Sequence, residues 1–373
     1  MNRLLDKIKN IINKYAPGII ILLWACVQIF LLYKNGIKTD LESVKYIREA
    51  DNILAIGNVS SPNFWFYSTQ VFLIAFFEKI QIGHVGVIVV QMFFSALATY
   101  KLFLFLKKRV HPLAAFTAIL LLILNIPFNQ YSTFLQTESL FHSFTILYIV
   151  YLLSVEKINA KNIFFIIAFL AVLTVTRPSG ILLYPATIIY IIFWKFKYQN
   201  YIVKYLAAFV LSIIALLVLN MGIQSGGELN FLLPFQKEMI ICGVPMQDAD
   251  IKVSSNPNSL AGMLYYVTHN FSQFANLAWR KTISFFGVYR PYYSTINNLY
   301  VCGMFLLLYL FSIIGMIKWY RSNKGLLFFC IITIITTWLS VVFSCDDWHN
   351  RWLLTLVPVL IILSSKGIER LLR

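Results

Sequence analysis

Long apolar runs recur along the whole chain, and they constrain its fold more than any other feature. Many of them are about 18 to 22 residues long, which an α-helix needs to cross the hydrocarbon core of a bilayer. Hydrophobic residues make up 59% of the 373 residues and charged residues only 12%, whereas soluble domains carry about 25% charged residues. The sequence therefore predicts an all-α polytopic integral membrane protein.

The apolar runs predict ten transmembrane helices in a single domain that covers residues 1–373. Two segments between them are too long for simple connections. Residues 34–83 would form a first outer loop with juxtamembrane helices, and residues 222–297 a large outer loop with helices such as one at 259–286. The ten predicted spans are 17–33, 84–106, 112–127, 138–155, 162–176, 180–195, 203–221, 298–317, 325–343 and 352–365.

The distribution of basic residues predicts the orientation of these spans. If residues 64–77 lie in the outer leaflet without crossing, 18 of the 31 Lys and Arg residues fall in short cytoplasmic segments, as the positive-inside rule requires. If residues 64–77 crossed, the basic cluster at 107–109 and every later loop would be inverted. We therefore expect both termini in the cytoplasm. The same rule explains the net charge of +16, so no nucleic-acid partner is expected.

Residues 36–57, GIKTDLESVKYIREADNILAIG, are predicted to form an amphipathic helix along the membrane surface. Glu42 fits a capping box with Thr39, although it is also a candidate substrate-binding residue. Glu49 and Asp51 fit a solvated face. Asp40 is the acid without a sufficient structural explanation, and we expect it to be catalytic. The apolar stripe of this helix would consist of Leu41, Val44, Ile47, Ala50 and Leu54.

Further acids and cations fall on the same predicted outer face. Glu138 is a second candidate catalytic acid, and Tyr293 a candidate substrate-binding residue. A carboxylate can take a proton from an attacking hydroxyl, while cations hold and stabilise a departing phosphate. This combination suits a phosphorylated, lipid-linked donor. The candidate phosphate ligands are Arg177, Lys281, Arg290 and Arg351.

Each of these residues also has a structural explanation. Glu138 stands at a helix N-terminus, where an acid is favourable, and Arg177 could extend to the lipid headgroups. Asp347 and Arg351 are four residues apart and could form a local ion pair. The five cysteines lack the spacing of a metal site. Cys242 and Cys345 could pair only if their loops meet in an oxidising compartment.

Several motifs occur along the chain in a recognisable order. The first outer segment contains D-x-x-x-x-x-Y-x-x-x-A-x-x-[IL]-x-x-G, which begins at Asp40 and ends at Gly57. SPNFWFYSTQVFLIAFFEKIQIG, YKLFLFLKKR, NIPFNQYSTFLQTESLF, TRPSG and CDDWHNRWLLTLVPVLIIL follow. In this order the chain resembles the membrane-embedded GT-C glycosyltransferases, especially bacterial relatives of protein O-mannosyltransferases and of the aminoarabinose transferase that acts on lipid A. It departs from their pattern at Ser61, where they have proline, and at Trp352, where they have tyrosine.

The resemblance implies a GT-C fold in a bacterial inner membrane with its active site on the extracytoplasmic side. It implies an inverting transfer of sugar from a polyprenyl phosphate to a glycan, lipid or protein acceptor. By position, Asp40 corresponds to the catalytic aspartate of the family and Glu138 to its second acid. A divalent cation, Mg²⁺ or Mn²⁺, between these two carboxylates is compatible with the family.

Two other classes of protein remain open from the sequence. A flippase or transporter of lipid-linked glycans would need polar groups along a path through the spans, and ionisable groups near the midplane are typical of coupled transporters. No acid falls near the middle of any predicted span. A noncatalytic membrane subunit would tolerate the loss of the Asp40 carboxylate.

Overall fold

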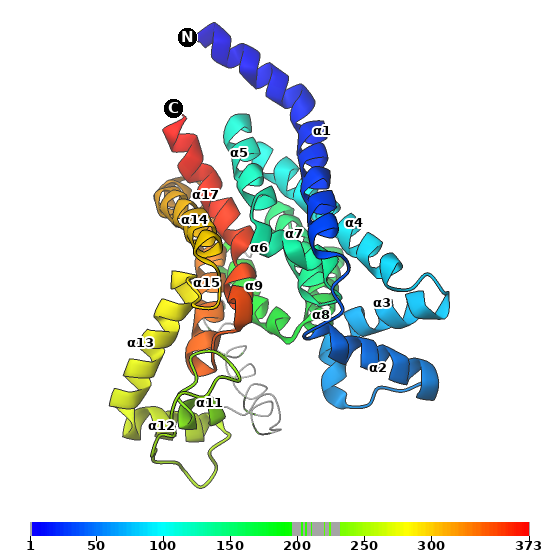
Figure 1. Ribbon diagram of the computed structural model, residues 1–373. Helices are drawn as coiled ribbons and strands as arrows, with labels where there is room; N and C mark the ends of the chain where they lie inside the picture. Colours follow the sequence, from blue (N-terminus) through cyan, green and yellow to red (C-terminus); the bar gives the residue numbers. More distant parts are fainter. Residues whose placement is uncertain are drawn as a thin grey trace. The chain divides into compact units, whose positions relative to one another are not determined.

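A computed structural model describes residues 2–195 and 232–372, with five isolated residues between them (Figure 1). For residues 2–14 and Lys195 it describes the backbone alone. Only four isolated residues of the predicted span at 203–221 are among those described. The internal contacts divide the chain into two compact units. Unit 1 comprises Met1–Tyr184, Leu306–Leu327 and Val357–Arg373, and unit 2 comprises Pro185–Phe305 and Phe328–Leu356.

Unit 1 is a bundle of apolar helices in which α4 packs on α7 and α5 packs on α17 (Figure 1). Asn159 caps α8 by accepting a hydrogen bond from the backbone N–H of Asn162 at 2.8 Å. Pro112 at the start of α5 suits a first turn that needs no N–H donor. The bundle helices are α1 (Asn2–Asn35), α4 (His84–Lys107), α5 (Pro112–Ile123), α7 (Glu138–Ser154), α8 (Ala160–Thr176) and α17 (Val357–Leu371).

Two glycines bring α17 close to the part of α14 (Thr295–Ser322) that belongs to unit 1. A Cβ on Gly315 would lie 1.9 Å from the carbonyl oxygen of Leu363, and one on Gly367 would lie 2.0 Å from that of Phe311. Backbones approach this closely only where small residues meet, which is the usual device of helix packing in membranes.

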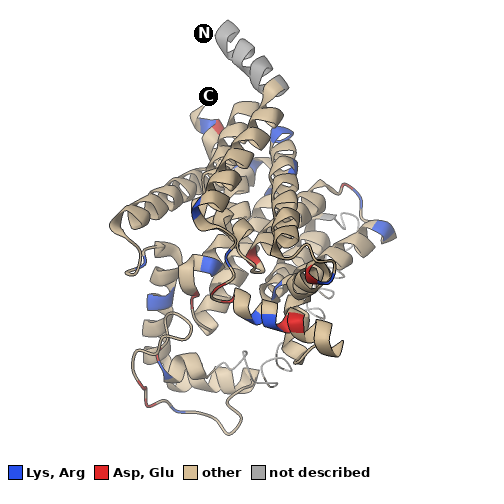
Figure 2. Ribbon diagram, turned by 45° about the vertical axis from the view of Figure 1, so that its right-hand side comes forward, with Lys and Arg blue, Asp and Glu red and all other residues tan. Residues whose placement is uncertain are grey.

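The described helices are consistent with a polytopic membrane protein. Four are long and apolar enough to cross a bilayer: Tyr15–Asn35, His84–Lys107, Thr295–Ser322 and Lys324–Phe343. Two bent pairs, Pro112–Ile123 with Ile126–Thr133 and Trp348–Leu354 with Val357–Leu371, raise the number to as many as six. Figure 2 shows how few charged residues interrupt the long helices. The predicted count of ten spans is not confirmed, because the apolar helices Glu138–Ser154, Ala160–Thr176 and Pro178–Trp194 are shorter.

The helices of the first outer segment differ from the prediction in the face they bury. Helix α2 begins at Ser43, and Leu41 before it has a φ of 57°. Its buried residues are Ser43, Tyr46, Glu49 and Ala50. Of the predicted apolar stripe, Leu41 lies before the helix and Ala50 is buried inside the protein, while Val44 and Leu54 are exposed and remain available to face a membrane. The predicted capping box is wrong, since Glu42 itself occupies the N-cap position and its side chain makes no capping hydrogen bond.

Residues 64–77, which we predicted not to cross, lie in the 3₁₀ helix η1 (Pro62–Tyr67) and in α3 (Ser68–Lys79). Helix α3 has 12 residues, so it is about 18 Å long, whereas the hydrocarbon core is about 30 Å thick. It is too short to cross on its own. Together with α2, against which it packs, it is suited to lie at a membrane surface.

Unit 2 contains the described part of the predicted large outer loop. The predicted helix at 259–286 is present as two helices, α12 (Leu260–His269) and α13 (Phe271–Gly287), which meet at Asn270. Ser259 caps α12 by accepting a hydrogen bond from Gly262. Unit 2 also contains α9 (Leu183–Tyr190) from Pro185 onward, the π-helical turn η4 (Ile191–Lys195), α11 (Leu233–Gln236), α16 (Arg351–Leu354) and most of α15 (Lys324–Phe343).

Candidate functional site

A buried polar loop, residues 125–137, joins α5 to α7 in unit 1. It contains the short helix α6 (Ile126–Asn129) and the 3₁₀ turn η2 (Gln130–Thr133). The side-chain amide of Asn129 donates to the carbonyls of Leu122, Ile123 and Asn125, at 2.8, 3.1 and 3.0 Å. Because the carbonyls of Leu122 and Asn125 also accept backbone bonds, the Asn129 amide ties together the end of α5 and the start of the loop where the helix breaks. The loop ends directly at Glu138.

The loop pairs with the chain segment that carries Asp40. The backbone N–H of Lys38 donates to Thr133 at 2.9 Å, and that of Leu135 donates to Lys38 at 3.0 Å. Asp40 follows two residues later and accepts a backbone bond from Ser43 at 3.1 Å. Its side chain is 61% exposed and lies 3.9 Å from the ammonium of Lys38. Asp40 is therefore an accessible carboxylate on an anchored backbone.

Glu138 and Arg177 form a buried ion pair in the same unit. Nη1 of Arg177 lies 2.6 Å from Oε1 of Glu138. Glu138 is the first residue of α7, and Arg177 follows the last residue of α8. The side chain of Glu138 is 0% exposed and that of Arg177 is 8% exposed. Arg177 therefore turns inward to a carboxylate and does not extend to the lipid headgroups.

Two other acids of the first outer segment, Glu42 and Glu49, are engaged locally. Oε2 of Glu42 accepts a hydrogen bond from Tyr46 at 3.3 Å and lies 3.8 Å from the ammonium of Lys45. Glu49 is buried and accepts bonds from the N–H and hydroxyl of Ser60, at 2.6 and 2.5 Å. The prediction that Glu49 belongs to a solvated face is wrong, because this carboxylate ties α2 to the loop that follows it.

In unit 2 the segment Ser344–Arg351 collects the other candidate residues. Arg290 and Asp346 form a buried ion pair, and Arg290 also donates to the carbonyl and hydroxyl of Ser284. Burial raises the pKa of Asp346, while the neighbouring guanidinium opposes this shift. Asp346 was not among the predicted site residues. The one signal for it in the sequence is a pair of acids directly after Cys345.

Arg351 and Tyr293 lie in the same part of unit 2 but have different partners. Arg351 lies 3.5 Å from Asp347, which confirms the predicted local pair. The hydroxyl of Tyr293 lies 3.1 Å from Nδ1 of His349, and the two rings stack. His349 has a φ of 57°, and its backbone N–H donates to the hydroxyl of Tyr292 at 2.9 Å.

Lys281 is fully buried on α13, where its ammonium donates to two backbone carbonyls. The acceptors are Val342 at 3.3 Å and Ser344 at 2.5 Å, at the end of α15. The ammonium also lies 4.0 Å from the centre of the Phe235 ring. Burial lowers the pKa of Lys281 to about 7. Through these contacts Lys281 holds the C-terminal end of α15.

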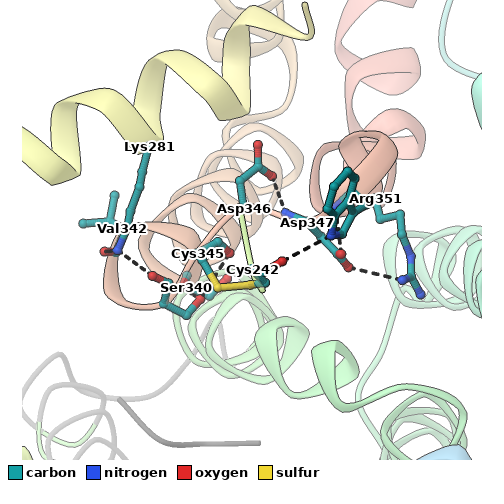
Figure 3. Close-up of a disulfide and its surroundings, with 10 residues drawn as sticks. Cys242, Lys281, Ser340, Val342, Cys345, Asp346, Asp347 and Arg351 are labelled. Atoms are coloured by element: carbon teal, nitrogen blue, oxygen red, sulfur yellow. Dashed lines mark hydrogen bonds and ion pairs between the residues drawn. A yellow bond between two sulfur atoms is a disulfide. The ribbon is translucent and has the colours of Figure 1, made fainter. Parts of the chain in front are cut away.

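Cys242 and Cys345 form a disulfide beside this cluster, with their Cα atoms 5.2 Å apart (Figure 3). Backbone bonds reinforce the link, because the N–H of Cys242 donates to Asp346 at 2.8 Å and that of Asp346 donates to Ile240 at 2.7 Å. The indole of Trp348 donates to the carbonyl of Cys242 at 3.2 Å. The disulfide therefore fixes the segment that carries Asp346, Asp347 and Arg351.

The structure thus brings the predicted residues together in two groups. Unit 1 carries Asp40, Glu42, Glu138 and Arg177, and unit 2 carries Lys281, Arg290, Tyr293 and Arg351. Over the described ranges, 2–195 and 232–372, no three His, Cys, Asp or Glu side chains form a metal-binding group. The carboxylate of Glu138 is bonded to Arg177, and that of Asp40 lies near Lys38.

Comparison with known proteins links the chain to one family. Nothing among curated proteins or solved structures matches it. Residues 69–220, about two fifths of the chain, match the family described as dolichyl-phosphate-mannose-protein mannosyltransferase. The matched segment contains α4, the buried polar loop, Glu138 and Arg177. Residues 69–220 are therefore similar to a segment of this mannosyltransferase family, which belongs to the GT-C superfamily of glycosyltransferases.

Proposed function

We propose that this protein is a GT-C glycosyltransferase that moves a sugar from a polyprenyl phosphate to an acceptor at the extracytoplasmic face of a bacterial inner membrane. The acceptor is a glycan, a lipid or a protein. The family match over residues 69–220 supports the reaction class. The apolar helices support the membrane location and a lipid-linked donor.

The proposed reaction is a direct displacement at the anomeric carbon of the donor. The acceptor oxygen forms the new bond to this carbon as the bond to the phosphate oxygen breaks, and the electron pair leaves with the phosphate. Asp40 takes the acceptor proton. A positioned carboxylate base typically contributes 10²–10⁴-fold to a rate. Attack opposite to the leaving group inverts the anomeric configuration.

One observation carries the assignment of Asp40. Its segment pairs through the backbone with residues 133–135, three residues before Glu138. This pairing joins the first outer segment to the family-matched part of the chain. Asp40 remains exposed, whereas Glu138 is buried against Arg177. Of these two acids, Asp40 is therefore the one that an acceptor can reach.

We propose Arg177, which lies in the same unit as Asp40 and Glu138, as a phosphate ligand, and Arg351 of unit 2 stays a candidate for this role. A guanidinium has five N–H donors in a planar fork, so it can keep a carboxylate and still offer donors to a phosphate. Glu138 then orients Arg177, and Asp347 orients Arg351. Lys281 and Arg290 fit a structural role better, because both are buried. Lys281 donates to the backbone carbonyl of Ser344, and Arg290 pairs with Asp346. Tyr293 and Glu42 stay candidates for contact with the substrate.

The disulfide supports the proposed side of the membrane. Disulfides persist in oxidising spaces such as the periplasm and are rare in the cytosol. Cys242 and Cys345 both lie in segments that the charge distribution assigns to the outer side. Their pairing is the arrangement expected if these loops face an oxidising compartment.

Transfer by purified protein from a panel of polyprenyl-phosphate sugars tests the proposal. We expect one donor to yield a glycosylated acceptor and free polyprenyl phosphate in equal amounts. Failure with every donor, together with movement of lipid-linked glycan across proteoliposome membranes, would overturn the proposal in favour of a flippase.

A further inference from the structure

A buried glutamine on α4 holds the loop that precedes Glu138. The side-chain amide nitrogen of Gln91 lies within hydrogen-bond distance of three loop carbonyls. The distances are 3.4 Å to Tyr131, 3.2 Å to Ser132 and 2.9 Å to Phe134. The two amide hydrogens are shared among these three oxygens. Gln91 is 0% exposed.

The orientation of the Gln91 amide is fixed by its other contact. Its oxygen accepts a hydrogen bond from the amide of Gln70 on α3 at 3.1 Å. The opposite orientation would place this oxygen against three carbonyl oxygens, which are all acceptors. The geometry therefore requires the donor end of Gln91 to face the loop.

A buried amide in an apolar bundle is unfavourable unless its hydrogen bonds are satisfied. Irregular backbone at membrane depth is tolerated only where other groups satisfy its carbonyls. The hydrogen bonds of Gln91 satisfy its own buried amide and, at the same time, carbonyls of the irregular loop. Gln28 on α1 supports the same loop, since its amide donates to Asn129 at 3.3 Å and its oxygen accepts from the hydroxyl of Ser132.

The carbonyls that Gln91 holds lie between the two proposed catalytic segments. Phe134 is flanked by Thr133 and Leu135, whose backbone groups bond to both sides of Lys38. Lys38 is two residues from Asp40, and Leu135 is three residues from Glu138. A displacement of residues 131–135 would therefore shift the Asp40 segment, which is bonded to them, relative to Glu138 at the start of α7.

We propose that Gln91 is a positioning residue that fixes the Asp40 segment relative to the Glu138 loop. The proposal rests on the proposed glycosyltransferase function, because it assigns the purpose of the positioning to Asp40 and Glu138. Gln91 does not touch the substrate. It acts through the backbone carbonyls of Tyr131, Ser132 and Phe134.

Hydrogen exchange in the purified full chain tests the positioning without any substrate. Gln91→Met keeps the size of the side chain but removes the donors. We expect the backbone amides of Lys38 and Leu135 to exchange at least tenfold faster in this variant. Ser95→Ala is the control, because it removes a side-chain hydrogen bond of α4, accepted from the indole of Trp24 at 3.1 Å, that involves neither Gln91 nor the loop. We expect less than a twofold change at both amides in that control.

Steady-state kinetics show whether the positioning serves the reaction. In Gln91→Met we expect kcat to fall at least tenfold while KM for the lipid-linked donor stays within threefold. Gln91→Glu keeps the polarity of the side chain but lacks its N–H donors. It should show the same fall in kcat with a nearly unchanged KM, and it replaces the methionine variant if that variant does not fold.

Unchanged exchange at Lys38 and Leu135, or an unchanged kcat with faster exchange, overturns the role of Gln91 and leaves the proposed function intact. A wild-type protein that transfers no sugar from any donor overturns the proposed function, while the exchange result still decides whether Gln91 holds the loop.

Discussion

Each of the three arginines proposed or considered as phosphate ligands lies against a carboxylate. Arg177 pairs with Glu138, Arg290 with Asp346 and Arg351 with Asp347. Pairing keeps these cations ordered and neutralises them in surroundings that would otherwise penalise a buried charge. A phosphate must therefore be bound by donors that the carboxylate leaves available. The phosphate would then bind to the N–H groups on the edge of the guanidinium that the carboxylate does not occupy.

The buried pair of Glu138 and Arg177 makes a prediction about stability. Removal of one partner of a buried pair costs about 3–5 kcal/mol, whereas replacement of both can be nearly neutral. We expect Arg177→Met to lower the free energy of unfolding by about that amount. Addition of Glu138→Gln should restore much of the loss. Unfolding by denaturant in detergent measures both, and a double variant that loses the sum of two single effects would contradict this account.

Lys281 makes a prediction about pH. Its pKa is about 7 in the folded protein and about 10.4 in an unfolded chain. Between these values the unfolded chain binds a proton that the folded protein has lost, so stability rises with pH. We expect the free energy of unfolding to increase by up to about 1.4 kcal/mol per pH unit above pH 7. Below pH 7 both states are protonated and this contribution is constant.

Denaturant unfolding between pH 6 and 10 measures the slope, and Lys281→Met should remove it. Lys237→Met is the control, since Lys237 is a partly exposed lysine in a surface pair with Asp248. If the free energy of unfolding depends on pH equally in wild type and in Lys281→Met, a group other than Lys281 causes the dependence.

At the scale of elements, the disulfide links the segment after α11 to the segment after α15. The two cysteines are 103 residues apart. A cross-link that closes so long a loop typically stabilises a fold by about 2–5 kcal/mol. We expect Cys242→Ala with Cys345→Ala to lower the stability by this amount, and a reductant to do the same to wild type. Calorimetry measures the change.

Cys302→Ala is the control, because Cys302 is a free thiol in unit 2. It should keep full sensitivity to the reductant. If the unfolding temperature of wild type stays the same in reductant, although Cys242 and Cys345 are shown to be reduced, the disulfide has no stabilising role.

The long helices could be predicted from sequence because hydrophobicity and length are local properties. The apolar runs at 17–33, 84–106, 298–317 and 325–343 all appear as helices. The buried face of α2 could not be predicted, because it depends on contacts from outside the helix. Glu49 is buried by a bond to Ser60, and Tyr46 packs in a cluster with α3, α4 and Leu135.

The candidate site was predictable in its residue types but not in its pairings. Arg177 and Glu138 are 39 residues apart, and Arg290 and Asp346 are 56 apart. Only the packing of separate helices brings such residues together. Only the local pair of Asp347 and Arg351 followed from sequence spacing. Gln91 carried no signal at all, because an isolated glutamine in an apolar run has no characteristic partner.

At the scale of the whole molecule, the distribution of charge predicts which loops face the cytoplasm. A reporter fused after Lys108, at the end of α4, should report the cytoplasm because the first outer segment returns without crossing. The short length of α3 agrees with this orientation. A reporter after Gly243, beside Cys242, should report the outer side. An outer signal after Lys108 would show that residues 64–77 cross the membrane.

The transfer activity of Asp40→Asn in membranes tests whether Asp40 is the catalytic base. If Asp40 is the base, we expect kcat to fall by roughly 10²–10⁴-fold while the protein folds and binds its donor as before. Asp51→Asn is the matched control, since Asp51 is an exposed acid on α2 and should keep transfer within twofold of wild type. An Asp40→Asn variant that transfers sugar at the wild-type rate would show that Asp40 is not the base.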